Sequence, residues 1–393
     1  MPKYSEHRIA TGRGRSEMKQ LRTIGIGLLI AIVLTGCWDQ KEIGEVNYAT
    51  AIGIDYEDNK YTLYVQLLDF SNVAKQEGSK LSETSPLYIG KGTGSTFMEA
   101  VNDLYETSQQ SINWGQIGAI IYSESVMEQG IEKVEQGMRR NGEFRYTPWI
   151  FGTTESIEKI LGESGFFHLP PVYTVLYKPN VTYKANSYIE PLRMYQFNAI
   201  YKEPGGTSLL PSISVNEGAW KESAAEEKPK GTLEIDGVFP VNEGKYRQWM
   251  SREEVRGLRW IDPKTNNTTI KVVQDGESIG TVEVIKPRAH IKPVEEDGAV
   301  KFNIKLKAKG QLTGLEEEMP AAEIEQLVKK QMEAEIVSTY QKGLDKDVDI
   351  YNLKNIMFHR GMRAKETEAF PLISDSLGKI SIDFHLESKG IYD

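Results

Sequence analysis

Alternating apolar and polar positions predict a β-hairpin at the start of the region that follows the first 46 residues. Apolar side chains occupy every second position of residues 61–67, and residues 47–55 form an equally strand-like run. The four residues between these runs, 57–60, have the composition of a turn. We therefore expect two neighbouring antiparallel strands, at residues 47–55 and 61–70.

Helical spacing begins after a glycine-rich segment at residues 90–94, which we expect to be a turn that opens a helix. Thr96 and Glu99 have the spacing of a capping box, in which each side chain accepts a hydrogen bond from the other's backbone. The apolar residues that follow recur on one helical face. They are Phe97, Ala100, Val101 and Leu104.

Helices and strands are predicted to alternate up to about residue 161. The pattern predicts strands over 86–90, 119–122 and 144–152, a helix over 125–140 with Ile131, Val134 and Met138 facing inward, and a helix over 153–161. A less regular stretch that contains several prolines then runs to residue 214. Residues 218–231 are charged and low in hydrophobicity, so we expect a linker or an exposed loop there.

The last 160 residues have a different pattern, because strands follow one another with little between them. Strands are predicted over 232–241, 268–274, 280–294 and 300–313, with a short helix over 251–260 whose capping box is Ser251 and Glu254. Short turns imply antiparallel pairing, since parallel neighbours need a crossover of about a dozen residues. A long helix after Pro320, stopped at Gly343, a second helix over 349–359 and a final strand over 380–386 complete this part. The apolar stripe of the long helix is Ile324, Leu327, Val328, Met332, Ile336 and Tyr340.

These elements predict an α+β fold: a multi-domain mixed α/β protein with mainly antiparallel sheets, whose C-terminal domain is an antiparallel sheet packed with a long helix. The chain of 393 residues exceeds what one hydrophobic core commonly supports, which is roughly 100 to 200 residues. We divide it into a leader (1–36), an N-terminal α/β region with one or two subdomains (37–215), the linker or loop (216–231) and a C-terminal α+β domain (232–393).

Cys37 is the only cysteine of the chain, and it directly follows a leader of the lipoprotein type. Lys19 and Arg22 precede an eleven-residue apolar run, residues 24–34, and small residues separate this run from the cysteine. Because a membrane-spanning helix needs about 20 apolar residues, the run is too short to span. We predict cleavage after Gly36, with S-diacylglycerol and a possible N-acyl chain on Cys37. The alternative is a buried cysteine after an ordinary helix.

Two or three acyl chains on Cys37 would hold the mature chain stably at a membrane, since a single chain binds only marginally. Translation can begin at Met1 or at Met18, because residues 18–22 already resemble a complete signal start. Using the only thiol for lipid leaves none for a disulfide, a zinc thiolate site or a cysteine nucleophile.

The net charge is −9 for the whole chain, and it becomes −13 without residues 1–36, which carry six basic and two acidic residues. Nucleic acid and anionic lipid headgroups repel a chain with this much negative charge. Its overall charge therefore recruits it to neither. We therefore expect no nucleic-acid partner, and we expect the covalent lipid alone to bring the protein to a membrane.

The candidate chemical sites are all weak. Lys91 precedes the glycines of residues 90–94 instead of following them, so the Walker pattern is absent and a turn before a capped helix is the better interpretation.

The four histidines after residue 37 lie far apart, and no Gly-x-Ser-x-Gly elbow occurs. Residues 316–318 are three glutamates that suit a solvated turn before a helix, and Asp55 suits a turn. The histidines are His168, His290, His359 and His385. No catalytic, cofactor-binding or metal-binding residue is predicted, and no enzyme.

Two further groups have a structural and a functional interpretation. Four aromatic residues near Pro148 could line a ligand pocket, but aromatic residues on strands are ordinarily core. They are Phe144, Tyr146, Trp149 and Phe151. The amphipathic helix 324–340 carries Lys329 and Lys330 beside several glutamates and lacks the basic face of a membrane-surface helix. We expect it to pack on the C-terminal sheet, with partner docking as the alternative.

Several segments, in order, resemble the C-subunit lipoproteins of bacterial spore germinant receptors, the Ger(x)C family. The run Cys-Trp-Asp-Gln-Lys-Glu-Ile at 37–43 and the run Ala-Ile-Gly-Ile-Asp at 51–55 are similar to the start of the mature family members. The later matching segments are 92–104, 237–239 with Trp249 and 254–260, 307–310, the long charged helix, 348–350 and 389–391. The resemblance covers nearly the whole chain after the leader.

The resemblance implies a non-enzymatic, lipid-anchored receptor subunit of three mixed α/β domains on the outer face of the spore inner membrane. It implies two partners, the polytopic A and B subunits, with which the subunit responds to small nutrients and triggers germination. The resemblance does not specify the nutrient or assign its binding to this subunit. The alternative is a substrate-binding lipoprotein of a transporter, which would have two doubly wound lobes, and an anchored hydrolase would need a convergent nucleophile and base.

Overall fold

The computed structural model describes residues 22, 24–26, 46–68, 87–223, 228–242, 244–315 and 319–387, without the side chain of His168. The chain divides into a unit of residues 1–46 and a unit of residues 47–393. The second unit holds the fold described below. Most of the leader, Cys37 and residues 316–318 lie outside the described residues, and so do the terminal residues 388–393.

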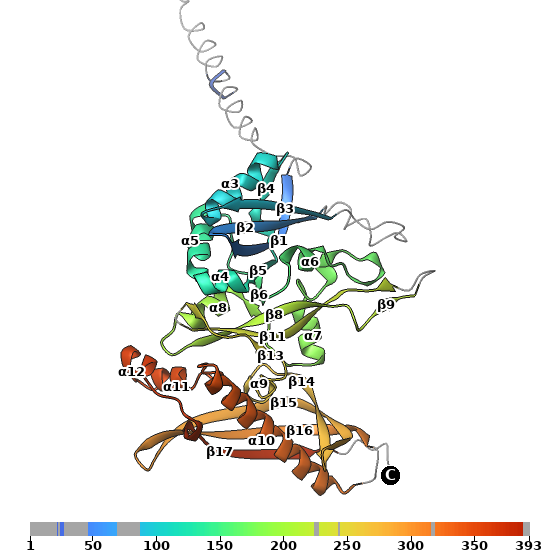
Figure 1. Ribbon diagram of the computed structural model, residues 1–393, viewed down its shortest axis with the longest axis vertical. Coiled ribbons are helices and arrows are strands. Elements are labelled where there is room, and N and C mark those ends of the chain that lie inside the picture. Colours follow the sequence, from blue (N-terminus) through green and yellow to red (C-terminus); the bar gives the residue numbers. More distant parts are fainter. Residues whose placement is uncertain are drawn as a thin grey trace, which may run out of the picture. The chain divides into compact units, whose positions relative to one another are not determined.

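An eleven-stranded mixed sheet dominates the first half of the fold (Figure 1). Its main path runs in the order β12-β11-β8-β6-β5-β1-β2-β3, and β4, β7 and β13 pair with its members. The strands on the path are β1 (Val46–Glu57), β2 (Lys60–Leu68), β3 (Leu87–Gly94), β5 (Ala119–Ser123), β6 (Trp149–Thr153), β8 (Thr207–Asn216), β11 (Thr232–Asn242) and β12 (Lys245–Tyr246). The short additional strands are β4 (Ser111–Asn113), β7 (Leu192–Arg193) and β13 (Met250–Ser251). The predicted antiparallel hairpin of β1 and β2 is confirmed.

Helices cover both faces of this sheet, because its central strands are apolar on both sides. The side chains of Ile120 and Ile150 pack into one core with α3, α4, α5 and α8, whereas those of Ile121 and Phe151 pack into a second core with α6. Figure 1 shows these groups of helices on opposite sides of the sheet. The helices are α3 (Phe97–Thr107), α4 (Glu124–Gln129), α5 (Ile131–Asn141), α6 (Ile157–Gly162), α7 (Pro179–Ala185) and α8 (Met194–Tyr201). The short 3-10 turns are η3 (Trp114–Gln116), η4 (Phe166–His168) and η5 (Pro171–Tyr173).

Three predicted elements in this half differ from the structure. The glycine-rich segment 90–94 is not a turn but the end of β3, paired with β2 along its length. The helix expected over 125–140 is broken at Gly130, whose φ of 95° lies outside the helical region, although its inward residues are buried as predicted. The strand expected over 144–152 begins only at Trp149, because Pro148 cannot donate a ladder hydrogen bond.

Strand β8 is a central strand that the sequence pattern does not reveal. It lies between β6 and β11 in the stretch that we expected to be irregular. The predicted linker or loop that follows is exposed and forms a small hairpin of β9 (Lys221–Glu222) and β10 (Lys228–Pro229). Strand β11, at the start of the predicted C-terminal domain, pairs with β8 over its length, so the large sheet continues across this hairpin.

The second half of the fold is a four-stranded sheet in the order β14-β15-β16-β17. Its strands are β14 (Asn267–Gln274), β15 (Glu277–Glu296), β16 (Ala299–Leu315) and β17 (Leu377–Leu386). The first three pair antiparallel as predicted, whereas β17 lies parallel to β16. The parallel pairing is possible because a long helical crossover, and not a short turn, connects these two strands.

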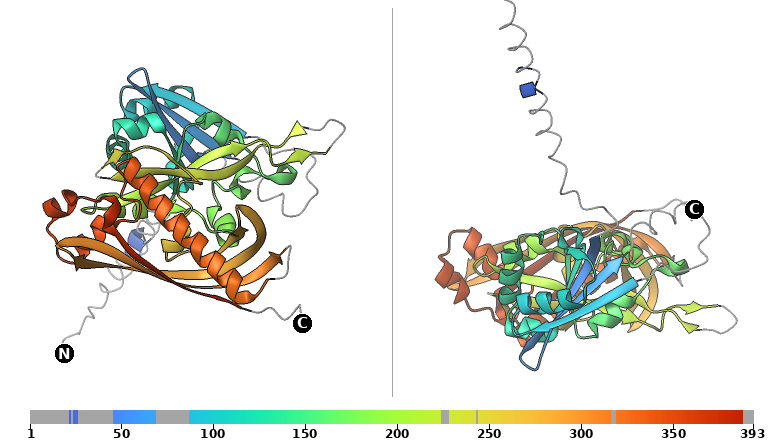
Figure 2. Two further views of the ribbon diagram at one scale, coloured as in Figure 1. Left: turned by 60° about the horizontal axis from the view of Figure 1, so that its bottom comes forward. Right: turned by 90° about the horizontal axis from the view of Figure 1, so that it is seen from above.

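The crossover begins with α10 (Ala321–Asp345), which lies across one face of the sheet (Figure 2). Its predicted stripe is buried except for Leu327, which is half-buried, and the helix ends two residues beyond Gly343. It is followed by α11 (Leu353–His359), α12 (Ala364–Glu368) and the 3-10 turn η6 (Ser374–Ser376). The helix expected over 251–260 is reduced to α9 (Leu258–Ile261), although both hydrogen bonds of its capping box, between Ser251 and Glu254, are present.

Asn352 joins the second half of the fold to the first. Its side chain accepts a hydrogen bond from the backbone N–H of Thr207 (2.6 Å) and donates one to the carbonyl of the same residue (3.0 Å). Asn355 extends this contact by donating to Glu203 (3.0 Å) and to the carbonyl of Pro204 (3.3 Å). The turn before α11 is thereby fixed to the start of strand β8.

Candidate functional sites

Cys37, the predicted lipidation site, lies outside the described residues, as does Gly36 before it. Its modification therefore stays a prediction from the sequence. None of the helices that the structure describes combines the length and the apolar composition that a membrane span needs.

The glycines of residues 90–94 serve the packing of α3 on β3. A Cβ atom at Gly92 would lie 2.2 Å from the carbonyl oxygen of Ala100, so only glycine lets the helix backbone lie this close. The N–H of Thr93 donates to the carboxylate of Asp103 (2.7 Å), so the anion at this segment belongs to the chain itself. Thr96 caps α3 as predicted, but its partner Glu99 accepts from the N–H of Ser95 instead of closing the box. This segment is therefore a helix-packing site.

The described histidines lie on separate elements. His290 is on β15, His359 on α11 contacts Glu203 (3.3 Å), and His385 on β17 contacts Glu325 (3.1 Å). In the part of the chain that the structure describes, no three His, Cys, Asp or Glu side chains gather as a group that could hold a metal ion.

Asp55, the last residue of the predicted strand 47–55, lies within β1 and has a structural role there. Its carboxylate accepts hydrogen bonds from the hydroxyl of Ser125 (2.9 Å) and from the N–H of Tyr56 (2.8 Å). It therefore holds the start of α4 against β1.

The four aromatic residues near Pro148 do not share one pocket. Phe144 packs against Phe97 and Trp114, and Tyr146 is exposed. The guanidinium of Arg193 lies 3.5 Å from the ring centre of Trp149, which favours a cation–π contact. The side chain of Phe151 lines a groove that Trp149 does not line. The structural interpretation holds for Phe144, Trp149 and Phe151, which pack in the cores of the fold, whereas Tyr146 is exposed.

The groove beside Phe151 has a volume of about 280 Å³ and is mainly apolar. Its lining includes Phe151, Tyr183, Tyr188, Pro211, Ile235 and Arg252. The guanidinium of Arg252 is held 4.0 Å from the ring centre of Tyr188. Burial raises the pKa of the Tyr183 hydroxyl far above its usual range, and the neighbouring Asp262, which accepts its hydrogen bond (2.7 Å), adds to this effect. Tyr183 is therefore neutral and acts as a donor. Ligand sites commonly start at about 300 Å³, so this groove is at the small end of that range.

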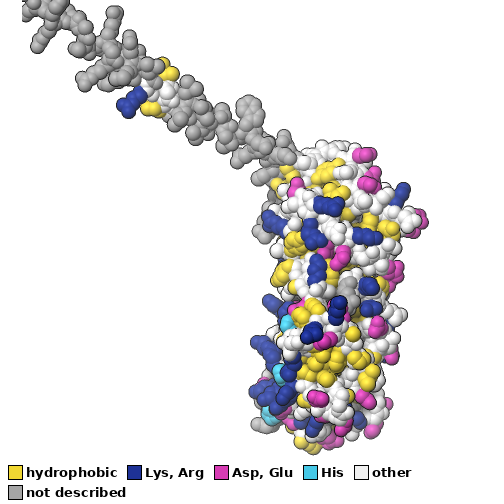
Figure 3. All heavy atoms as spheres, turned by 90° about the vertical axis from the view of Figure 1, so that its left-hand side faces the viewer, with side chains coloured by type: hydrophobic (Ala, Val, Ile, Leu, Met, Phe, Trp, Pro, Cys, Tyr) yellow, Lys and Arg dark blue, Asp and Glu magenta, His cyan; other side chains and the backbone are white. Residues whose placement is uncertain are grey.

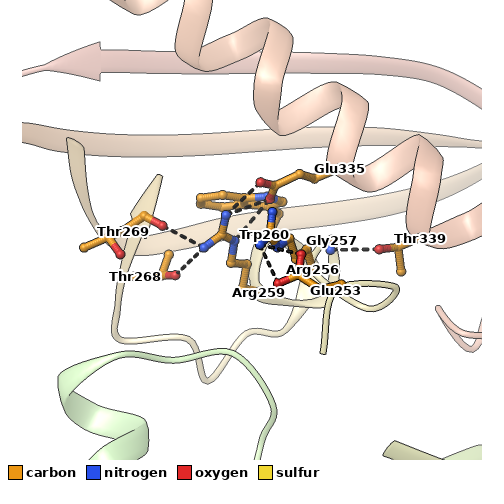
Figure 4. Close-up of polar contacts among 9 residues, drawn as sticks. All are labelled: Glu253, Arg256, Gly257, Arg259, Trp260, Thr268, Thr269, Glu335 and Thr339. Carbon is orange, nitrogen blue, oxygen red and sulfur yellow. Dashed lines mark hydrogen bonds and ion pairs between the residues drawn. The ribbon is translucent and has the colours of Figure 1, made fainter. Parts of the chain in front are cut away.

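The most strongly charged buried feature is an ion pair between α9 and α10 (Figure 4). The guanidinium of Arg259 contacts both carboxylate oxygens of Glu335 at 2.8 Å, and both side chains are at most 8% exposed. Trp260 donates its indole N–H to the same carboxylate (2.7 Å). Arg259 also donates to the hydroxyl of Thr268 and to the carbonyl of Thr269 on β14. This network joins helix, turn and strand. Its charged and polar groups form hydrogen bonds with one another.

This ion pair was not predicted from the sequence, although the sequence contains a signal for it. Glu335 lies three residues after Met332 and directly before Ile336, so it borders the buried stripe of α10. An acid at such a position needs a buried partner. The partner could not be deduced from spacing, because Arg259 is 76 residues away in the chain.

Comparison with known proteins assigns the chain to a family. A model of the spore germination protein N-terminal domain matches residues 39–215, and a model of the C-terminal domain of spore germination B3/GerAC-like proteins matches residues 237–390. The chain is similar to spore germination protein KC of Bacillus subtilis (strain 168), at 23% identity over 85% of this chain and 86% of that protein. It is also 23% identical to spore germination protein B3 of the same organism, over 84% of this chain and 83% of that protein.

The fold agrees with a solved structure of this kind. The crystal structure of the GerBC protein matches with a TM-score of 0.53 and 16% identity, over 86% of this chain and 96% of that chain. The two family models, matched in this order along the chain, define the class as a spore germination protein. The chain belongs to the Ger(x)C family of germinant receptor C subunits, as its motifs predict.

Proposed function

We propose that the protein is the lipid-anchored, non-enzymatic C subunit of a nutrient germinant receptor. In this proposal it acts with polytopic A and B subunits on the outer face of the spore inner membrane, and the complex triggers germination. The observation that carries the proposal is the match of both family models, in order, over residues 39–215 and 237–390.

The leader and the geometry of the described residues support this function. The apolar run and the lone cysteine of residues 24–37 have the pattern of a lipoprotein signal. The strongest buried network, around Arg259 and Glu335, consists of groups that bind one another and join structural elements. Such a protein acts through its surfaces, by contact with membrane partners.

The partnership is tested by purification of the tagged chain from spore membranes. We expect two polytopic membrane proteins to co-purify with it, encoded by genes that neighbour its own. Recovery of the chain alone, from membranes in which such proteins are present and intact, would contradict the proposed receptor complex.

The anchor is tested separately by the Cys37→Ala variant. We expect this variant to leave the membrane fraction and to impair germination, whereas the parent chain should carry diacylglycerol on the Cys37 sulfur, detectable by mass spectrometry. A variant that fractionates like the parent chain, or a parent chain with a free thiol and an uncut leader, would contradict the anchor.

The alternative of a transporter's substrate-binding lipoprotein has less support. That class would need a second doubly wound lobe, whereas the second half of this fold is a four-stranded, mainly antiparallel sheet with one long helix across it.

A further inference from the structure

The charges of this acidic chain are not evenly distributed, because cations gather on one face of the four-stranded sheet. The face comprises the outward side chains of the middle part of β15 and β16. We call it the lysine face, and its members are Arg288, His290, Lys292, Lys305, Lys307 and Lys309, all of them exposed. Figure 3 shows Lys, Arg and His side chains gathered along one side of the molecule, whereas acidic groups are interspersed elsewhere on the view.

The alternation of β16 sets the direction of these side chains. Phe302, Ile304, Leu306 and Ala308 are buried in the core that also contains the stripe of α10. The lysines between them must therefore point to the opposite side of the sheet. The register places Arg288 opposite Lys307 and His290 opposite Lys305, so basic side chains of the two strands are direct neighbours.

Few acids balance these cations. Lys309 pairs with Glu387 (2.8 Å), and Asp383 lies opposite Lys307 on β17. Lys292 and Lys305 make no ion pair with any residue within the described ranges, and neither does Lys307. Like charges directly opposite one another on a sheet destabilise it. Arg288 and Lys307 form such a pair, and a binding partner of opposite charge would offset the free energy that this pair costs.

The residue types indicate the chemistry of that partner. Protein interfaces are depleted in Lys and enriched in Tyr, Trp, Phe and Arg, whereas this face has four lysines to one arginine and no Tyr, Trp or Phe among its members. Single-stranded nucleic acids are bound by stacking on aromatic rings, which the face does not provide. Lysine is a flexible point charge, so it suits a diffuse layer of anions that imposes no fixed geometry.

We propose that the lysine face lies against anionic phospholipid headgroups, as a second membrane contact in addition to the lipid on Cys37. The inference rests on the proposed anchor, which keeps the chain at a membrane. Each lysine close to an anionic surface increases the binding constant about fivefold, and the effect is lost beyond about 8 Å in physiological salt. The rest of the acidic body is repelled by the same surface. Together, these forces fix which side of the protein faces the membrane.

The test uses the full lipidated chain in vesicles, with brief acylation of accessible lysines quantified by mass spectrometry. One set of vesicles is phosphatidylcholine alone, and the other also contains phosphatidylglycerol as the anionic lipid. We expect Lys292, Lys305 and Lys307 to react about fivefold more slowly in the anionic vesicles. This protection should disappear at about 1 M salt, where the screening length is about 3 Å. Lys133 and Lys330, which are exposed on α5 and α10, should react equally in both sets.

A charge-reversed variant supplies the matched comparison. Lys379 is an exposed residue of β17 whose backbone N–H donates to Asn303, the residue opposite Lys292, so it should also be protected in the parent chain. The triple variant K292E/K305E/K307E should lose this protection of Lys379, whereas K133E/K330E/K365E, with the same change in net charge at exposed sites elsewhere, should keep it. Both variants should remain folded, with a cooperative thermal transition, because the changed side chains touch no core.

Three outcomes would count against these proposals in different ways. Equal lysine reactivity in both vesicles, with the chain retained on them, overturns the lysine face alone. Protection that is independent of lipid charge and rises with the number of chains per vesicle indicates contact between copies and also overturns it. A chain that does not stay with the vesicles contradicts the anchor.

Discussion

The Arg259 guanidinium and the Glu335 carboxylate form a buried bidentate pair in which one nitrogen lies 2.8 Å from each carboxylate oxygen. The Nε of Arg259 also donates to Glu335 (3.2 Å), and its second terminal nitrogen donates to Thr268 and Thr269. Trp260 supplies a further donor to Glu335. A buried ion pair costs desolvation energy, which hydrogen bonds of good geometry must offset. Here, the pair specifies how the turn after β13 sits between α10 and β14.

We expect either Arg259→Ala or Glu335→Ala to lower the free energy of unfolding by about 3 to 5 kcal/mol, because each leaves an unpaired buried charge. The double variant Arg259→Ala/Glu335→Ala should cost much less than the sum of the two single changes. Urea unfolding of the four chains measures the coupling directly.

The matched control is an exposed pair on the same helix, Lys342 and Asp345, which lie 3.8 Å apart. Lys342→Ala should change stability by less than about 0.5 kcal/mol, as is usual for exposed pairs. Additive effects of the Arg259 and Glu335 changes would show that the buried pair is not an energetic unit.

Asn352 yields a second prediction, because its side chain completes the backbone pairing of Thr207. Asn352 has φ 54°, which glycine also adopts, so Asn352→Gly keeps the turn and removes only the two hydrogen bonds. Leaving the backbone N–H and C=O of the buried Thr207 unpaired should cost roughly 2 kcal/mol or more.

Asn59 provides the control for that change. It has φ 61° in the exposed turn between β1 and β2, and Asn59→Gly should leave the urea midpoint within the error of the measurement. If Asn352→Gly were as harmless as Asn59→Gly, the contact between the two halves of the fold would not depend on this side chain.

Periodicity predicted those elements whose pattern reflects their own burial. The hairpin of β1 and β2, the buried face of α3 and the stripe of α10 follow from spacings of two and of three to four residues. Strand β8 was missed because Pro211 argues against a central strand. The structure accommodates this proline where β8 pairs with β6 only at the adjacent residue Ser212, so the missing N–H disturbs little of that ladder.

Other features depend on contacts between distant residues, and local patterns cannot reveal them. The glycines of residues 90–94 resemble a turn, yet they are needed because the backbone of α3 lies on β3. The lysines of β16 alternate like any half-exposed strand, and only the register shows that Arg288 and His290 face them. The family motifs predicted the class of protein, whereas these sites required the fold.

Gly257, in the turn between β13 and α9, supports a third prediction. A Cβ atom there would lie 2.5 Å from the hydroxyl of Tyr351 and 2.6 Å from the carbonyl oxygen of Glu335. Gly257→Ala should therefore push α9 away from α10 and cost about 1 to 3 kcal/mol of stability. Gly314→Ala, at a strand position with open space around it, should be close to neutral. Equal effects in urea unfolding would mean that the close contact at Gly257 is not maintained in solution.

Asp349 predicts a pH dependence of stability. Burial raises the pKa of its carboxyl from 3.8 to about 6, although the N–H groups of Lys354 (2.7 Å) and Leu353 (2.9 Å) donate to it at the start of α11. The folded chain therefore holds this proton more tightly than the unfolded chain. The resulting stabilisation is fully present below about pH 3.8 and is lost as the pH rises through about 6.

The Asp349→Asn variant lacks the titrating group, so it isolates this contribution. Between about pH 4 and pH 7, the unfolding free energy of the parent chain should fall relative to that of the variant, by up to roughly 3 kcal/mol. Urea unfolding of both chains at unit steps of pH measures the difference. Lys354→Met removes the nearby positive charge that favours the ionised carboxylate, and should therefore raise the pKa further and shift the decline to higher pH. A difference between parent and Asp349→Asn that does not vary with pH would show that this carboxyl titrates alike in the folded and unfolded chains.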